Sequence, residues 1–233
     1  MRRIVILFFL TLYTGLALGQ PLDSYSSQRR SMVQTQIRNR GVKHEETLKA
    51  METVQRHLFV PSSYRSSAYD DRPLPIGYGQ TISQPYIVAY MTELMKPTKD
   101  MIALEIGTGS GYQAAVLAEI VDRVYTIEIV PQLGTSAESI LKKQGYNNVT
   151  VKIADGYHGW KEKGPFDIIM VTAAADHIPP PLIEQLKEGG KMIIPVGSPF
   201  LVQQLMLVEK KNGKARTRSL IPVRFVPFTR SEE

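Results

Sequence analysis

The chain has 233 residues, of which 43% are hydrophobic and 21% charged, a balance typical of a folded globular protein rather than a disordered one. The absence of cysteine excludes disulfides, thiolate–zinc sites and a cysteine nucleophile. The histidines do not fall at metal-ligand spacing, so we expect no metal, and the formal net charge of +6 is too diffuse to predict nucleic-acid binding.

Residues 1–20 have the three-part pattern of a secretory signal peptide. Arg2 and Arg3 precede an uncharged stretch from Ile4 to Leu18, and Ala17-Leu18-Gly19 offers small residues for a cleavage site. The apolar stretch is short for a membrane span, which needs about 20 residues. We therefore expect a signal-like leader over residues 1–20, with an uncleaved anchor or a misassigned start codon as alternatives.

The chain that follows begins with a predicted linker and a helical region. Residues 21–31 are polar and predict the linker. From Met32 to Val60, apolar residues recur near helical spacing, with one break at Gly41. Residues 61–83 are interrupted by prolines and glycines and predict a loop, after which Gln84–Met95 predicts a helix.

After Pro97, strand and helix patterns alternate. The predicted strands are Met101–Ile106, Arg123–Val130, Val149–Ala154, Phe166–Thr172 and Lys191–Val196, and the predicted helices are Tyr112–Val121, Gln132–Gln144 and Pro180–Leu186. Leu201–Glu209 and Thr217–Val226 predict a hairpin around the turn dipeptide Asn212-Gly213. This order predicts one α/β domain over residues 32–230, with a doubly wound sheet, a helical N-terminal segment and a C-terminal antiparallel hairpin.

A glycine-rich motif, LEIGTGSGY, occupies residues 104–112, where the first predicted strand of the alternating region meets a helix. Its glycines allow a tight turn and close approach of a ligand. Tyr112 stands where a dinucleotide fingerprint has its third glycine, which disfavours a pyrophosphate site and hydride transfer. Glu105 suits a cationic ligand instead. An acid followed by G-x-G-x-G resembles motif I of S-adenosylmethionine-dependent methyltransferases; a purely structural glycine turn is the alternative.

Two further acids end the next two strands. Glu128 is placed to accept both hydrogen bonds of a ribose diol, although enzymes that use NAD do the same. Asp155, followed by Gly156, ends the third strand, where it could hold an adenine amino group. Each acid alone could be a solvated or capping residue. Acids at three successive strand ends make coincidence a poor explanation.

Residues 69–85, YDDRPLPIGYGQTISQP, resemble the signature of the bacterial protein-L-isoaspartate O-methyltransferases. The similarity covers roughly residues 30–228 and returns in six further segments: 104–112, 155–160, 166–175, 186–190, 195–197 and 223–227. It implies a Rossmann-like class I methyltransferase sheet. It also implies an enzyme that transfers a methyl group from S-adenosylmethionine to the α-carboxylate of L-isoaspartyl residues in damaged proteins, after which the ester collapses to a succinimide.

The resemblance also implies roles for individual residues. The family's active-site serine corresponds to Ser83. Positions matching cofactor contacts are Gln80, Thr81, Ile82, Glu105, Gly107, Gly109, Gly111, Glu128, Asp155 and Gly156. Positions matching segments that hold the peptide are Ile76, Gly77, Val171, Thr172, Ala173 and Ala174. Asp176 departs from the family, which commonly has proline there.

The chemistry fits a site without a catalytic triad. The acceptor carboxylate is already ionised at pH 7, so no general base is needed. We expect the Ser83 hydroxyl to donate to the acceptor carboxylate or to position it rather than to attack, with a helix cap as the alternative for this serine.

The resemblance implies a cytoplasmic enzyme that acts on isoaspartyl proteins and peptides. We expect it to be a monomer, and the histidine spacing and the diffuse charge predict neither a metal nor a nucleic-acid partner. The signal-like leader makes export to the periplasm the alternative location. Two other functions stay open: an exported, non-catalytic module that binds S-adenosylmethionine, and a methyltransferase of the same fold with another acceptor.

Overall fold

The structure, a computed structural model, describes residues 24–198 and 200–231. The predicted leader and the first three residues of the predicted linker lie outside the described residues. No helix within the described ranges is long and apolar enough to cross a membrane.

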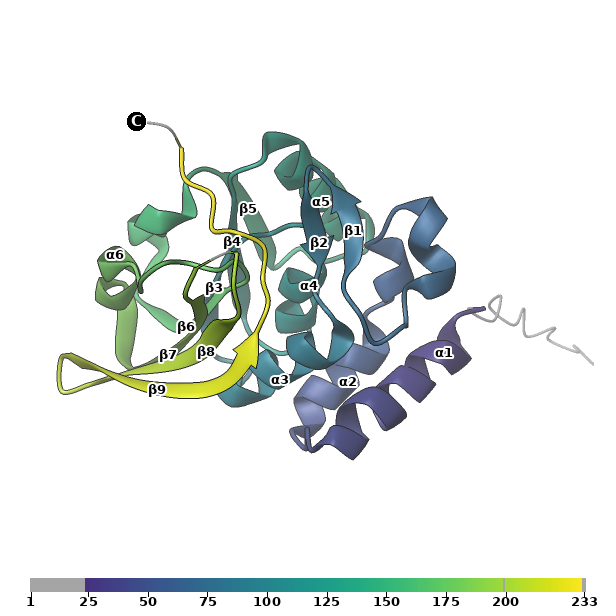
Figure 1. Cartoon of the computed structure of the whole chain (residues 1–233), viewed down its shortest axis with the longest axis horizontal. Helices are drawn as coiled ribbons and strands as arrows, with labels where there is room; N and C mark the ends of the chain where they lie inside the picture. Colours follow the sequence, from purple (N-terminus) through teal and green to yellow (C-terminus); the bar gives the residue numbers. More distant parts are fainter. Residues whose placement is uncertain (1–23, 199, 232–233) are drawn as a thin grey trace, which may run out of the picture.

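Within these ranges, seven strands form one sheet in the order β5-β4-β3-β6-β7-β8-β9 (Figure 1). The strands are β3 Ile102–Ile106, β4 Arg123–Glu128, β5 Val149–Ile153, β6 Phe166–Val171, β7 Leu186–Val196, β8 Gln203–Lys211 and β9 Lys214–Val223. The pairs from β5 to β7 are parallel, whereas β7–β8 and β8–β9 are antiparallel. The chain runs outward in both directions from β3, which confirms the predicted doubly wound sheet with its C-terminal hairpin.

Both faces of the central strands are buried. Along β6, Ile168 and Met170 belong to one hydrophobic cluster, and the alternating residues Ile169 and Val171 belong to the other. This alternation follows from the two-residue period of a strand, and it explains why the sequence of β6 is an almost continuous apolar run. The helices that pack on the sheet are α3 Pro85–Met95, α4 Tyr112–Ala118, α5 Pro131–Lys143 and α6 Pro180–Glu184. Helix α2, Glu45–Thr53, packs against α3 and α4.

The N-terminal segment corrects the predicted linker. Ser26–Ser31 form helix α1, which runs directly into the π-helical turn η1, Met32–Ile37, and the 3₁₀ turn η2, Arg38–Arg40. Helix α1 buries none of its own residues, so its sequence shows no apolar periodicity. It is continuous with the buried residues of η1. Gly41 ends this stretch with φ 99°, as its predicted break requires.

The predicted loop at 61–83 contains a small hairpin. It begins with the 3₁₀ turn η4, Ser62–Ser67, and then forms β1, Leu74–Gly77, paired antiparallel with β2, Gln80–Ile82. Gly77, Tyr78 and Gly79 all have positive φ at its tip. Strands of three and four residues that contain proline and glycine give no strand pattern in the sequence, so the loop prediction missed them.

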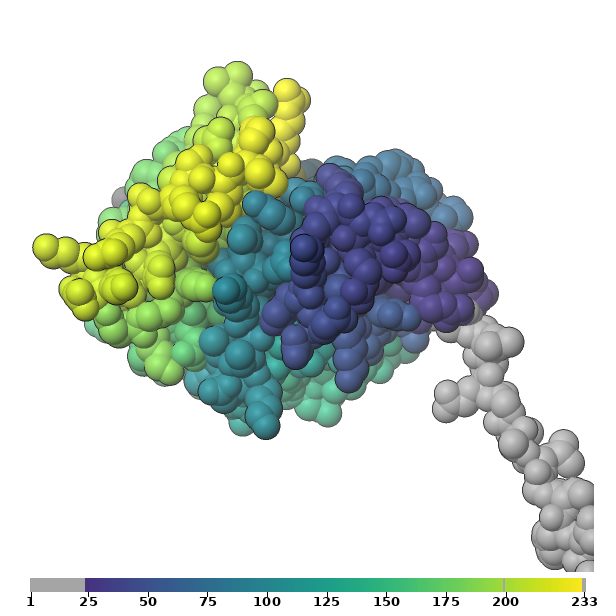
Figure 2. All heavy atoms as spheres, turned by 90° about the horizontal axis from the view of Figure 1, so that it is seen from below, coloured from purple at the N-terminus to yellow at the C-terminus, as the bar shows by residue number. Residues whose placement is uncertain are grey.

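Other differences concern element ends. β7 begins at Leu186 rather than Lys191, and α6 ends at Glu184, two residues before the predicted end. The 3₁₀ turns η3 Arg56–Leu58, η5 Gly156–His158 and η6 Lys161–Lys163 complete the elements. In Figure 2 the purple N-terminal residues and the yellow C-terminal residues lie toward opposite ends of the visible face.

Candidate functional site

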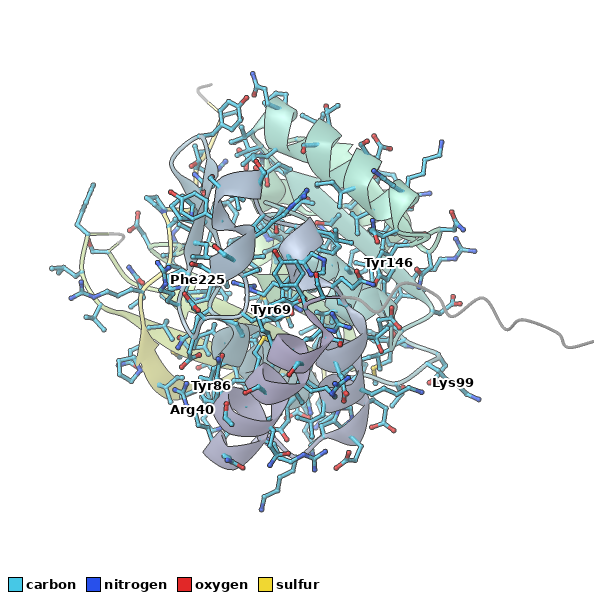
Figure 3. The ribbon with its side chains drawn as sticks, turned by 90° about the vertical axis from the view of Figure 1, so that its right-hand side faces the viewer. Arg40, Tyr69, Tyr86, Lys99, Tyr146 and Phe225 are labelled. Atoms are coloured by element: carbon cyan, nitrogen blue, oxygen red, sulfur yellow. The ribbon has the colours of Figure 1, made fainter. Side chains whose placement is uncertain are left out.

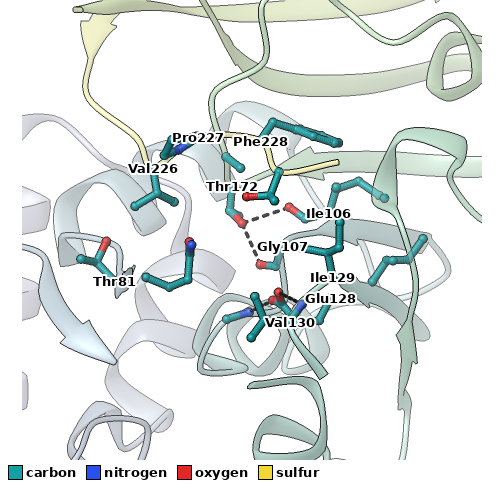
Figure 4. Close-up of a pocket in the computed structure, with 16 residues that line it drawn as sticks. Thr81, Ile106, Gly107, Glu128, Ile129, Val130, Thr172, Val226, Pro227 and Phe228 are labelled. Carbon is teal, nitrogen blue, oxygen red and sulfur yellow. Dashed lines mark hydrogen bonds between the residues drawn. The ribbon is translucent and has the colours of Figure 1, made fainter. Parts of the chain in front are cut away.

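A pocket opens at the carboxyl edge of the parallel strands (Figure 4). Its floor comes from the ends of three strands and the residues after them, represented by Ile106, Glu128 and Thr172. β2 contributes Gln80 and Thr81 on one side. A doubly wound sheet places ligands at this edge, where the strand order reverses next to β3.

The glycine motif forms the turn between β3 and α4. Gly107 has φ 94°, and a Cβ added there would lie 2.5 Å from Thr172 Oγ1. That hydroxyl donates to the Gly107 carbonyl at 2.7 Å and to the Ile106 carbonyl at 3.0 Å, as the dashed lines in Figure 4 show. Only glycine fits both this conformation and this contact. Gly111, with φ 86°, is the N-cap residue of α4.

Glu128 is held with both carboxylate oxygens in fixed positions. Its Oε2 accepts from the Gly109 N–H at 2.7 Å, and its Oε1 accepts from the Val130 N–H at 3.0 Å. The residue is 5% exposed and lines the pocket. Each carboxylate oxygen has two acceptor sites, so one remains on each after these bonds. This geometry fits the ribose diol of a nucleoside.

Glu105 lies fully buried beneath the glycine turn. Thr126 Oγ1 donates to its Oε2 at 2.5 Å, and Thr126 Oγ1 also lies 2.6 Å from Thr108 Oγ1. Its Oε1 has no hydrogen-bond partner among the described residues. Burial raises the pKa of Glu105 to about 8. The hydrogen bond from Thr126 lowers this pKa, and the negative charge of Glu128 raises it further. A buried acid with an open oxygen fits a cationic ligand.

Ser83 lies between two hollows. One is a small cavity that it lines together with Glu105, Gly107 and Gln113, and Ile82 also lines that cavity. The other is a groove at the surface that it shares with Pro73, Arg224 and Phe225. Figure 3 shows Phe225 on the same side of the molecule as Arg40 and Tyr86, with Lys99 and Tyr146 on the other side.

The helix-cap alternative for Ser83 is wrong. The N-cap residue of α3 is Gln84, and that position has no side-chain cap. Among the described residues, the Ser83 hydroxyl makes no hydrogen bond, so it is available to a ligand in either hollow.

The predicted peptide contacts divide into two groups. Thr172 and Ala173 line the pocket, and Ile76 Cδ1 lies 3.4 Å from the Cβ position of Gly109, above the glycine turn. Gly77 stands in open space at the hairpin tip. Val171 and Ala174 are buried, and the Ala174 backbone bonds to Val226 and Phe228, so the structure leaves neither of these side chains open to a peptide.

Asp155 contacts the C-terminal segment. Its Oδ1 accepts from the Tyr157 N–H at 2.9 Å, and its Oδ2 pairs with Arg230 Nε at 2.8 Å. The neighbouring Gly156 lines the pocket. It approaches Ile106 so closely that a Cβ added to Gly156 would lie 2.4 Å from Ile106 Cγ2. The adenine role expected of Asp155 stays a prediction.

The sequence reasoning gave no role to the C-terminal residues at the site. Val226, Pro227, Phe228 and Thr229 line the pocket, and Arg224 and Phe225 line the groove. The similarity over residues 223–227 was the signal that could have found them. Within residues 24–198 and 200–231 there is no cluster of three side chains suited to a metal ion.

Comparisons with known proteins find similar sequences in one enzyme family. The sequence model of the protein-L-isoaspartate(D-aspartate) O-methyltransferases matches residues 27–233. A protein-L-isoaspartate O-methyltransferase of Opitutus terrae is 55% identical over the full length of both chains. Another, from Syntrophobacter fumaroxidans, is 54% identical over 97% of this chain and 95% of its own.

Solved structures give the same result. A protein-L-isoaspartate O-methyltransferase superposes with a TM-score of 0.77 at 30% identity, and the match covers 85% of this chain and 65% of that protein. A Plasmodium falciparum protein described as a methyltransferase of this kind, in complex with S-adenosyl-L-homocysteine, has a TM-score of 0.76 at 26% identity over 87% of this chain and 99% of its own. The chain therefore belongs to the protein-L-isoaspartate(D-aspartate) O-methyltransferase family.

Proposed function

We propose that this chain transfers a methyl group from S-adenosylmethionine to the α-carboxylate of L-isoaspartyl residues in damaged proteins. The observation that carries the proposal is the position of Ser83. Its hydroxyl, without a partner among the described residues, lies where a cavity beside Glu105 meets a groove open to solvent. A methyl group delivered from the cavity side would meet an acceptor lying in the groove.

The pocket residues hold the cofactor. The Glu128 carboxylate accepts from the ribose diol, the turn formed by Gly107, Gly109 and Gly111 lies against the cofactor, and Asp155-Gly156 lies beside the base. Burial favours the neutral form of Glu105, and a cationic group bound beside it would favour the ionised carboxylate. S-adenosylmethionine, when bound, supplies a methyl group on a positively charged sulfur. Family membership supports these roles, and the two open acceptor sites of Glu128 independently support its own contact with the ribose.

The groove residues hold the acceptor. Ser83 donates its hydroxyl proton in a hydrogen bond to the α-carboxylate. The extended peptide is also held by the backbones of Gly77, at the hairpin tip, and Ala173, in the pocket lining, both of which lie outside the groove lining. No acidic residue is among the described groove-lining residues, and Arg224 adds a positive charge. This electrostatic setting favours an anionic acceptor.

Methyl transfer joins an anion to a cation and leaves neither charge. In the step, an oxygen–carbon bond forms as the carbon–sulfur bond breaks, and the electron pair of the broken bond stays on sulfur. Neutralisation is favoured where water is excluded, and holding the two reactants in line can supply roughly 7–11 kcal/mol. The chain therefore needs to bind, orient and exclude water, and no proton has to be removed.

We further propose that the enzyme works in the cytoplasm, the location that the resemblance to its family implies, and that it works as a monomer. Export of the mature protein is the competing possibility raised by residues 1–20. Amino-terminal sequencing of the mature protein distinguishes retention from removal of the leader, and size-exclusion chromatography with light scattering measures the oligomeric state.

The decisive experiment compares two peptides that differ only in having isoaspartate or aspartate at one position. With labelled S-adenosylmethionine, we expect methylation of the isoaspartyl peptide alone. We expect the Ser83→Ala variant to lose about 10- to 100-fold in kcat/KM, since a hydrogen bond to a charged group is lost at the reacting centre.

Two results would contradict the proposed function. Equal methylation of both peptides would contradict the acceptor, and a panel of other acceptors would then identify the substrate. Tight cofactor binding without turnover on any acceptor would favour the non-catalytic module.

A further inference from the structure

The last described residues form one wall of the cofactor pocket. Val226–Thr229 line the pocket opposite the glycine turn, and we call Val226–Ser231 the C-terminal strap. In Figure 4 its residues Val226, Pro227 and Phe228 lie above Thr172. A ligand that fills the pocket therefore contacts a segment within a few residues of the chain end.

The strap is attached at its start by backbone hydrogen bonds. The Ala174 N–H donates to the Val226 carbonyl at 2.8 Å, and the Phe228 N–H donates to the Ala174 carbonyl at 2.8 Å. These two bonds fix the strap to the residues that follow β6. Neither bond involves Thr229, Arg230 or Ser231, so this end of the strap depends on other contacts.

The far end is attached through side chains. Arg230 Nε donates to Asp155 Oδ2 at 2.8 Å, and the Arg230 guanidinium lies 3.7 Å from the centre of the Tyr157 ring. The N–H and Oγ of Ser231 reach the same carboxylate oxygen at 3.3 and 3.2 Å. Tyr157 in turn contacts the rings of His158 and His177 edge-on.

This attachment differs from an ordinary surface ion pair in the burial of its carboxylate. The Asp155 side chain is only 7% exposed, whereas that of Arg230 is 39% exposed. Burial alone would raise the pKa of Asp155, but hydrogen bonds from Arg230, the Tyr157 N–H and the Ser231 N–H lower it below its usual range. Asp155 is thus ionised at neutral pH and fixed in place beside Gly156, which lines the pocket.

We propose that Arg230 is a positioning residue that fastens the C-terminal strap to Asp155 and Tyr157, and that this fastening sets how long the cofactor and its product stay bound. The inference rests on the proposed function, since it takes the pocket to be the cofactor site. The fastening joins two elements of the same wall, and both line or adjoin the pocket. Arg230 therefore acts on affinity and release, and it touches no reacting atom.

The test measures binding without any acceptor peptide. Calorimetry with S-adenosylmethionine and with S-adenosylhomocysteine gives Kd for the parent, Arg230→Gln and Arg230→Lys. Arg216→Gln is the matched control, because Arg216 is an exposed arginine of β9 with no ion pair among the described residues. Stopped-flow displacement gives the dissociation rate of S-adenosylhomocysteine, and steady-state assays with an isoaspartyl peptide separate KM from kcat.

We expect Arg230→Gln to raise both Kd values and the dissociation rate by about tenfold, as loss of a charge-assisted hydrogen bond predicts. Arg230→Lys should fall between it and the parent, because lysine keeps the charge but loses the planar contact with Tyr157. KM for S-adenosylmethionine should rise, whereas kcat at saturation should not fall. If Arg230 had a purely structural role, Arg230→Gln would instead lower the thermal midpoint without raising KM selectively over kcat.

An unchanged Kd and dissociation rate in Arg230→Gln would overturn the inference, as would an equal change in Arg216→Gln. Hydrogen exchange adds a check that is independent of activity: S-adenosylhomocysteine should protect the amides of residues 228–231 in the parent and protect them less in Arg230→Gln. If the parent binds the cofactor but methylates no isoaspartyl peptide, the proposed function fails while the binding comparison still decides the role of Arg230.

Discussion

The two sides of the cofactor pocket are built differently. One side consists of strand ends in a sheet buried on both faces, with Ile106, Glu128 and Thr172 joined through the glycine turn. The other side consists of the β1–β2 hairpin and the C-terminal strap. Two short strands form the hairpin, and a few hydrogen bonds hold the strap. The first side is inseparable from the fold, whereas the second can change its contacts without unfolding the sheet.

Substitution of Gly107 by alanine should have the largest effect, because Gly107 belongs to the side of the pocket that is built from strand ends and the glycine turn. The new Cβ would lie 2.5 Å from Thr172 Oγ1 at a backbone φ of 94°. We expect the free energy of unfolding to fall by about 3 kcal/mol and cofactor binding to be lost in calorimetry.

Gly145→Ala is the matched control for that change. Gly145 has a similar φ of 85°, but nothing lies within 4 Å of its added Cβ. The strain alone should cost about 1–2 kcal/mol and leave cofactor affinity unchanged. Equal losses of affinity in both variants would mean that backbone strain, and not the contact with Thr172, explains the result.

Glu128→Gln should have the next largest effect. The amide would turn an NH₂ group toward one of the two backbone N–H groups, those of Gly109 and Val130, that now donate to the carboxylate. It would also offer the ribose one acceptor instead of two. We expect Kd for S-adenosylmethionine to rise about 10- to 100-fold in calorimetry with a smaller loss of stability. Glu138→Gln, on α5 and remote from the pocket lining, is the control, and a comparable rise there would refute the assignment.

The sequence predicts the two sides of the pocket to different extents, because only long buried strands leave a clear pattern in it. β3 and β6 were predicted within one residue at each end because strands buried on both faces are continuous apolar runs. β1 and β2 have four and three residues, too few for a pattern. The contact of Asp155 with Arg230 joins residues 75 positions apart, so no local signal could reveal it. Family resemblance pointed to Ser83 and Ile76, but only the fold shows that one serine borders both hollows.

The pH dependence of stability tests the buried first side. Burial raises the pKa of Glu105 from 4.5 to about 8, so folding favours the protonated carboxyl. The protonated Glu105 carboxyl contributes its full share of folding stability below about pH 4.5, and this share is lost as the pH rises toward and through 8. The thermal midpoint of the cofactor-free protein should therefore fall between pH 5 and pH 9 more steeply than that of Glu105→Gln.

A bound cation should reverse part of that loss, because it favours the ionised carboxylate. The parent should then gain more thermal stability from S-adenosylmethionine at pH 8 than Glu105→Gln does. Parallel pH profiles of the two proteins, with and without cofactor, would show that Glu105 does not titrate in this range.

The smallest effect belongs to the groove, at Arg224, two residues before the strap begins. Arg224 is exposed and lines the groove, and it has no ion pair among the described residues. Its charge acts across solvent, where exposed pairs contribute little and salt screens them. We expect Arg224→Gln to raise KM for an isoaspartyl peptide about two- to fivefold at low salt, with the difference vanishing near 0.5 M salt and Kd for the cofactor unchanged. Lys211→Gln, at the distant tip of the β8–β9 hairpin, is the control. We expect it to change neither KM for the peptide nor its salt dependence. A change in cofactor affinity caused by Arg224→Gln would show instead that the groove and the pocket are coupled through the strap, whose first residue, Val226, lines both.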